Sequence, residues 1–153
     1  DIGVIELDPN DGEAAPGRRV GCRTYLEQAG IPWSTVHVAV GHGTTRDGYA
    51  AASRLLTDHP WLTGLVCGND CMAMGAYAAI REQGLRVRED VAVIGIDDQE
   101  LIADQVHPAL TTVALPFEEM GQVAVSHLLA LMEGEEVPAE TLLPGTIIRR
   151  SSA

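Results

Sequence analysis

One stretch of the chain carries most of the information about its fold: residues 62–98, with the sequence LTGLVCGNDCMAMGAYAAIREQGLRVREDVAVIGIDD. Two short apolar runs, at 62–67 and 91–96, flank a segment that opens at Asp70 and ends at Gly84. Continuous apolar runs of this length are typical of strands that are buried on both faces of a sheet. A helix between two such strands predicts a β-α-β unit with parallel strands.

The same alternation precedes this stretch. Residues 2–7 and 36–40 predict two further strands. A helix is predicted over 18–28, stopped by the glycine and proline that follow it, and a second helix begins after Thr44 or Thr45 and runs to about Thr57. The first 96 residues therefore predict an α/β fold with a doubly wound parallel sheet.

The remainder of the chain has a different order of elements. Residues 111–115 predict another short strand, and 118–132 has apolar residues at helical spacing, ended by Gly134. A last strand is expected at 146–148. The first strand already begins at residue 2, which predicts that the chain is part of a longer protein.

Composition limits the partners of these residues. The chain has 153 residues and a formal net charge of −12, and all of its basic residues are arginines. Because an acidic surface repels a phosphate backbone, we expect no direct contact with nucleic acid. The three cysteines lack the spacing of a disulfide or zinc framework, which favours reduced thiols in a cytoplasmic protein, and no apolar run is long enough to span a membrane.

Polar side chains follow each of the first four expected strands. Because ligands of open α/β sheets bind at the carboxyl ends of the strands, these residues are the candidate site. They are Asp8, Asn10, Asp11, Arg18, His42, Gly43, Thr44, Asn69, Asp70, Asp97 and Asp98. The mixture of carboxylates, an amide and a guanidinium suits a neutral polyhydroxylated or heterocyclic ligand. Position at the sheet edge favours Arg18, Asn69 and Asp97 over the others.

Several of these candidates have a purely structural alternative. Asp70 is expected to be a helix N-cap, and Asp98 to cap a short segment at 99–103. Arg18 and His42 are equally consistent with solvated surface residues. These alternatives stay open at the level of the sequence.

Catalytic and cofactor motifs are absent from the sequence. It has neither a glycine-rich phosphate-binding loop nor a G-x-S-x-G nucleophile motif. Asp97 and Asp98 are neighbours at a strand end, so their side chains point apart and we expect no acid/base pair. The five histidines have no metal-ligand spacing. We therefore expect a protein that is not an enzyme and that uses no cofactor or metal.

Three segments resemble the LacI/GalR family of transcriptional regulators. They are CGNDCMA at 67–73 together with GIDD at 95–98, LTTVALPFEEMG at 110–121, and LLPGTIIRRSS at 142–152. The resemblance covers the whole chain. It implies the effector-binding region of a repressor, in which a small molecule binds between two lobes that resemble those of periplasmic sugar-binding proteins.

The resemblance also implies a division of the chain. Residues 1–110 would belong to the C-terminal lobe, 111–135 to a crossover segment of the N-terminal lobe, and 136–153 to a return into the C-terminal lobe. The rest of the N-terminal lobe and the DNA-binding helix-turn-helix would lie outside this chain. Operator DNA would then be contacted only through that helix-turn-helix.

Four residues are implied as effector contacts. Arg18 would hydrogen-bond the effector, Asn69 and Asp97 would contact its polar groups, and Phe117 would form an apolar wall of the cleft. The sequence departs from the family pattern in two segments. It has Gly-His-Gly-Thr at 41–44, where some members place an aromatic residue, and Leu115 where many have glutamine. These departures leave the effector open, with a sugar or nucleoside as the default.

Members of the family form homodimers through the C-terminal lobe. Met74, Tyr77 and Leu101 would match that interface, although apolar residues at helical spacing are equally expected in the core. Two other functions remain as alternatives: the lobe of a periplasmic sugar receptor, and an α/β enzyme of the flavodoxin type. The apolar helix at 118–132 needs burial, and exchange with a second molecule is one way to provide it.

Overall fold

The chain folds around one six-stranded sheet. The computed structural model describes residues 1–12 and 14–153. The strands and helices are β1 (Ile2–Leu7), α1 (Ala14–Gln28), β2 (His37–Gly41), α2 (Thr45–Asp58), β3 (Gly64–Cys67), α3 (Asp70–Glu82), β4 (Ala92–Asp97), α4 (Glu100–Ala103), β5 (Thr111–Ala114), α5 (Phe117–Met132) and β6 (Thr146–Ile148). The strand order is β2-β1-β3-β4-β5-β6.

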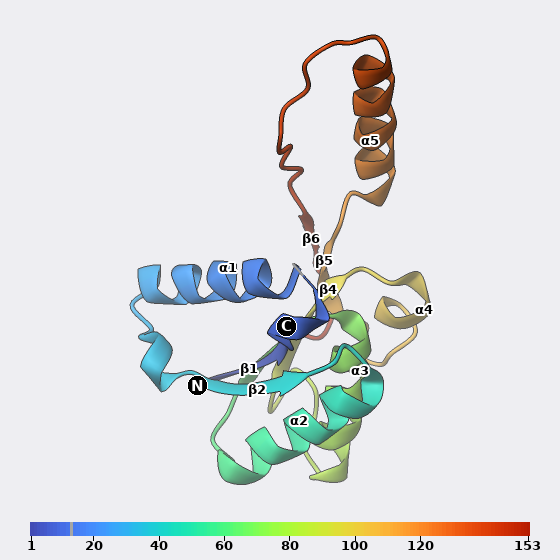
Figure 1. Cartoon of the computed structure of the whole chain (residues 1–153). Helices are drawn as coiled ribbons and strands as arrows, with labels where there is room; N and C mark the ends of the chain where they lie inside the picture. The colour runs from blue at the N-terminus through green and yellow to red at the C-terminus, as the bar shows by residue number, and fades with distance from the viewer. Residues whose placement is uncertain (13) are drawn as a thin grey trace.

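The first five strands are parallel, and β6 pairs antiparallel with β5 at one edge. Helices cover both faces: α1 lies on one, and α2 and α3 pack side by side on the other (Figure 1). The predicted α/β fold with a parallel sheet is therefore confirmed. Because β5 pairs with β4, the sheet itself includes Thr111–Ala114.

The core lies between the sheet and the α2–α3 layer. Ile5, Leu65 and Val93 point into it from three adjacent strands, and Ile80 enters it from α3. The two helices approach closely because each has a glycine at the crossing. A Cβ atom on Gly75 would lie 2.1 Å from the carbonyl oxygen of Thr45, so only glycine fits.

Helix ends agree with the sequence in part. Thr44 caps α2, since its side chain accepts a hydrogen bond from the backbone of Asp47. The cap of α3 is Asn69 and not Asp70, and the cap of α4 is Gln99 without a side-chain bond, so the caps expected from Asp70 and Asp98 are wrong. In both cases the carboxylate instead binds a residue distant in sequence, Thr112 for Asp70 and Arg150 for Asp98.

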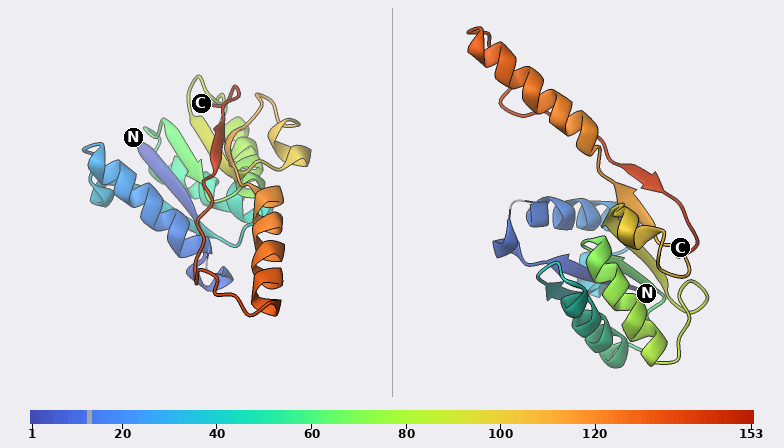
Figure 2. Two further views of the ribbon diagram at one scale, coloured as in Figure 1. Left: turned by 90° about the horizontal axis from the view of Figure 1, so that it is seen from above. Right: turned by 90° about the vertical axis from the view of Figure 1, so that its right-hand side faces the viewer.

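The helix α5 and the segment at 133–145 project away from the sheet (Figure 2). None of the residues of α5 is buried, and several of its large apolar side chains, among them Leu128, Leu131 and Met132, are more than half exposed. This apolar helix therefore has no partner within the described chain. Among residues 1–12 and 14–153, no helix is long and apolar enough to cross a membrane.

Candidate functional site

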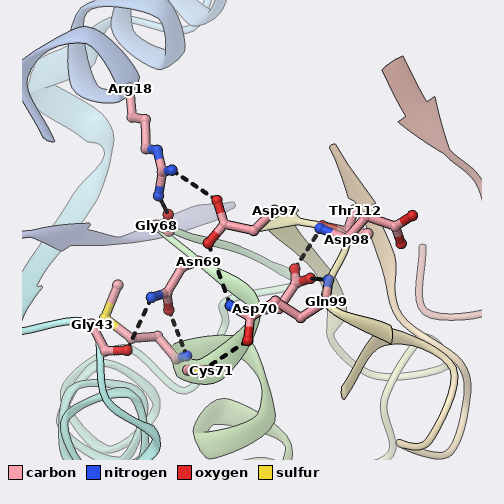
Figure 3. Close-up of polar contacts among 11 residues, drawn as sticks. Arg18, Gly43, Gly68, Asn69, Asp70, Cys71, Asp97, Asp98, Gln99 and Thr112 are labelled. Atoms are coloured by element: carbon pink, nitrogen blue, oxygen red, sulfur yellow. Dashed lines mark hydrogen bonds and ion pairs between the residues drawn. The ribbon is translucent and has the colours of Figure 1, made fainter. Parts of the chain in front are cut away.

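The candidate site lies where β3 and β4 end and where α1 begins its second turn. Arg18 reaches down from α1 and binds both strand ends (Figure 3). Its Nη2 donates to Oδ1 of Asp97 at 2.8 Å, and its Nη1 donates to the carbonyl oxygen of Gly68 at 2.5 Å. The side chains of Arg18 and Asp97 are 22% and 16% exposed, so the ion pair is partly shielded but open to a ligand.

Asp97 is held in an unusual backbone conformation. Its φ is 114° and that of Asp98 is 53°, a region that is costly for residues with side chains. The turn sends the two carboxylates to different arginines, Asp97 to Arg18 and Asp98 to Arg150 at 2.8 Å. The expectation that they form no acid/base pair agrees with this geometry. Strain of this kind is common where a side chain must be aimed at a ligand.

Asn69 joins two of the loops at this edge. Its Oδ1 accepts from the backbone N–H of Met72 at 2.8 Å, which caps α3, and its Nδ2 donates to the carbonyl oxygen of Gly43 at 2.9 Å. One lone pair and one N–H of the amide remain for another partner. Asn69 therefore positions the loop after β2 and still has capacity to bind a ligand at the edge of the site.

Asp70, for which the sequence leaves a ligand contact and a capping role open, takes neither role and organises the site from below. It is fully buried, and it accepts hydrogen bonds from Thr112 Oγ1 at 2.6 Å and from the backbone of Gln99 at 2.8 Å. Burial raises the pKa of this carboxyl, the two hydrogen bonds oppose that shift, and the charges of Asp97 and Asp98 add to it. Asp70 thus links α3, the end of β4, and β5.

One feature of the sequence, the glycine at position 95, is a signal for the buried position of Asp70. A Cβ on Gly95 would lie 2.1 Å from Asp70 Oδ1, so the glycine in the GIDD segment makes room for the buried carboxylate. Without the tertiary structure, that glycine is equally consistent with other close contacts.

Phe117 lies apart from these residues. It is 60% exposed and lines an open hollow at the base of α5 together with Leu115 and Pro116, a hollow to which Arg18, Asn69 and Asp97 do not contribute. Three of the four expected effector contacts are thus brought together, and the fourth is on the projecting segment.

The remaining candidates after β1 and β2 form local turns. Asp8 accepts hydrogen bonds from the backbone and side chain of Asn10, and these bonds lower the pKa of the Asp8 carboxyl. The side chain of Asp11 lies outside the described part of the structure. The backbone of His42 donates to Asp47, which fixes the loop beside Asn69.

The three expected interface residues differ in exposure. Leu101 is 89% exposed and Met74 is half-buried. Tyr77 is only 2% exposed, and its hydroxyl donates to the carbonyl oxygen of Pro108 at 2.9 Å. Tyr77 therefore lies in the core of the described chain, in line with the core alternative.

Comparison with known proteins agrees with the fold. A family model described as a periplasmic binding protein-like domain matches residues 1–153. The chain is 38% identical over 157 residues to the HTH-type transcriptional repressor PurR of Yersinia pestis bv. Antiqua (strain Antiqua), covering 100% of this chain and 45% of that protein. The chain thus spans less than half the length of the curated relatives that it matches.

Solved structures of similar shape include other repressors. A Lac repressor dimer bound to operator and the anti-inducer ONPF superposes with a TM-score of 0.91 and 31% identity, over 99% of this chain and 52% of that one. A complex of the transcriptional regulator CelR with cellobiose gives a TM-score of 0.91 and 32% identity, over 99% and 46%. The Escherichia coli transcriptional repressor AscG gives 0.87 and 31%, over 100% and 55%.

The chain belongs to the periplasmic binding protein-like domain family. Within that class, it is an effector-binding region of the LacI/GalR type, as its similarity to the Lac repressor and AscG structures and to the PurR sequences shows. The family resemblance that the motifs at 67–73, 95–98 and 142–152 predict is confirmed.

Proposed function

We propose that this chain is the ligand-sensing part of a transcriptional repressor, and that the Arg18–Asp97 pair binds a small sugar. The pair is the observation that carries the proposal. A guanidinium can only donate hydrogen bonds and a carboxylate can only accept them. Two neighbouring hydroxyl groups do both, so one can accept from Arg18 while the next donates to Asp97.

The geometry leaves room for such a ligand. Asp97 Oδ2 has only a long contact, 3.5 Å, with Gln99 Nε2, so it has capacity for a stronger donor. The pair has no net charge, which suits a neutral ligand better than a phosphate. Among the similar structures, CelR is bound to cellobiose and a regulator from Arthrobacter sp. FB24 is bound to lactose. A nucleoside also presents neighbouring hydroxyls and is the second candidate.

The second wall of the site would come from the segment that projects from the sheet. We infer that α5, with Phe117 at its start, belongs to a second lobe whose remainder lies outside this chain, as the division at about 111–135 predicts. The exposed apolar side chains of α5 support this, because they need a partner that the described chain does not provide. Exchange of α5 with a second copy is the competing arrangement.

A ligand held between two lobes would favour the closed arrangement over the open one, and it would act on a helix-turn-helix outside this chain. The net charge of −12 supports the view that these residues do not contact operator DNA themselves. The relatives are repressors, which favours a cytoplasmic regulator over a periplasmic sugar receptor. Met74 and Leu101 would form part of a homodimer interface.

A binding role also fits the chemistry better than catalysis. In the part of the chain that the structure describes, each acidic group of the site is held by an arginine or by a buried hydrogen bond. Asp70 is paired with the hydroxyl of Thr112, but Thr112 is fully buried, so that hydroxyl is not accessible to a bound substrate. We therefore propose that the domain is not an enzyme.

The test is a calorimetric titration of the full-length regulator with a panel of disaccharides, monosaccharides and nucleosides. We expect one sugar to bind, and the variants Arg18→Ala and Asp97→Ala each to lose about 10-fold or more in affinity, because a charged hydrogen bond contributes about 1.5–3 kcal/mol. Arg23→Ala is the matched control on α1, since Arg23 pairs with exposed Glu27 and with no residue of the site. Equal losses of affinity in all three variants, or an affinity that is unchanged in Arg18→Ala and Asp97→Ala, would contradict the proposal.

A further inference from the structure

A second pocket lies under α1, on the face of the sheet opposite to α2 and α3. It has a volume of about 230 Å³. Its floor is formed by Val4, Val66 and Ile96 of three adjacent strands, and its roof by Ala15 and Cys22 of α1. These walls are apolar, and they include neither Asn69 nor Asp97. The pocket is therefore distinct from the proposed sugar site, although Arg18 borders both.

One carboxyl group breaks the apolar lining. Glu6 of β1 is 5% exposed and also lines the pocket. Its Oε2 is 3.4 Å from Nη1 of Arg19, whereas its Oε1 is fully buried and receives no hydrogen bond from any described residue. A buried acceptor without a donor is unfavourable, and native proteins rarely leave one in place. This acceptor needs a donor that the described residues do not provide.

The charges around the pocket restrict what that donor can be. Arg18 is paired with Asp97 and Arg19 with Glu6, so the charges around the pocket are compensated and favour a neutral molecule over either ion. The size restricts it further. An apolar cavity of about 150 Å³ accepts a benzene molecule, so about 230 Å³ admits one ring with a polar substituent.

We propose that the pocket under α1 binds a small neutral aromatic molecule, of the phenol or indole class, whose O–H or N–H group donates a hydrogen bond to Oε1 of Glu6. The ring packs between the apolar side chains of the sheet and those of α1. This proposal does not depend on the sugar site, because neither Asp97 nor Asn69 takes part in it. A molecule bound there would rest against Arg18, so it would also change the affinity of the first site.

The experiment compares phenol with toluene, which has almost the same shape but no donor. Each is titrated into the 153-residue chain, and binding is followed by ligand-observed NMR, with circular dichroism as the check of folding. We expect phenol to bind at least about 10-fold more tightly than toluene, since the hydrogen bond to a carboxylate is lost in toluene. Equal affinities, or no binding of either to the folded chain, would overturn the proposal and leave water as the occupant.

Two variants locate the binding. Glu6→Leu removes the acceptor, and Ala15→Leu fills the pocket from α1 while Glu6 is kept. Glu6→Leu should weaken phenol binding to about the level of toluene, and Ala15→Leu should abolish it, whereas Val20→Ala, on the exposed side of α1, should leave it unchanged. If Glu6→Leu does not fold, Ala15→Leu and the comparison with toluene still decide. Phenol binding that survives Ala15→Leu would show that the site is elsewhere.

Discussion

Two helices of this chain are both rich in apolar residues, and they have opposite fates. Eight of the 13 residues of α3 are buried, whereas none of the 16 residues of α5 is. The difference is the surface that each meets. The sheet and α2 cover α3, and no described element covers α5. Apolar composition therefore creates a need for burial, and only a neighbouring surface determines whether that need is met.

The largest expected difference between the two helices concerns their big apolar side chains. Ile80→Ala in α3 should lower the free energy of unfolding by about 2–5 kcal/mol, because Ile80 is fully buried and its loss leaves a cavity. Leu128→Ala in α5 should change it by less than about 0.5 kcal/mol, since Leu128 is 56% exposed. Urea denaturation of the 153-residue chain measures both. Similar values would show that α5 packs on the sheet in solution.

The glycines of the two regions give a second comparison. Gly75→Ala should destabilise the chain by about 1–3 kcal/mol or more, because the new Cβ would meet the backbone of α2. Gly121→Ala in α5 meets nothing within 4 Å and should instead strengthen that helix, by about 0.5–1 kcal/mol. Circular dichroism during thermal unfolding would detect the opposite signs. A neutral Gly75→Ala would mean that α2 and α3 are farther apart than described.

The buried carboxyl of Asp70 gives a third expected effect on stability, and α5 has no buried residue with which to compare it. Asp70→Asn should cost about 1–3 kcal/mol, because an amide cannot accept both of the hydrogen bonds that the carboxyl accepts. Since the pKa of Asp70 is raised in the folded chain, its contribution is complete below about pH 4 and is lost as the pH rises through its folded value. The variant should lack that decline. An unchanged pH dependence of stability would contradict the assignment.

The smallest effect concerns helix capping. Thr44→Ala should destabilise α2 by about 1 kcal/mol, because the cap of the backbone N–H of Asp47 is lost. Thr45→Ala is the matched control, since Thr45 lies one residue inside the helix and is not the cap. No such change is available for α5, whose cap, Pro116, makes no side-chain hydrogen bond. Equal effects of the two threonine variants would place the start of α2 elsewhere.

Local pattern predicted which polar residues lie close together, but it did not predict which apolar residues are exposed. Arg18, Asn69 and Asp97 were chosen because they follow strands or open a helix, and the structure places them at one edge of the sheet. Tyr77 is expected at the dimer interface from the family resemblance, whereas its helical spacing equally allows a place in the core. Spacing does not distinguish a helix face that meets the sheet from one that meets another molecule, and Tyr77 lies in the core.

The sequence by itself determined the strands, the helices and the parallel sheet, because apolar periodicity and capping act over only a few residues. The tertiary structure alone decided how distant residues meet. Asp70 meets Thr112, Asp98 meets Arg150, and Oε1 of Glu6 is buried without a hydrogen bond from any described residue. The physical reason is that charge pairing and burial depend on distances in space, which the order of residues along the chain does not contain.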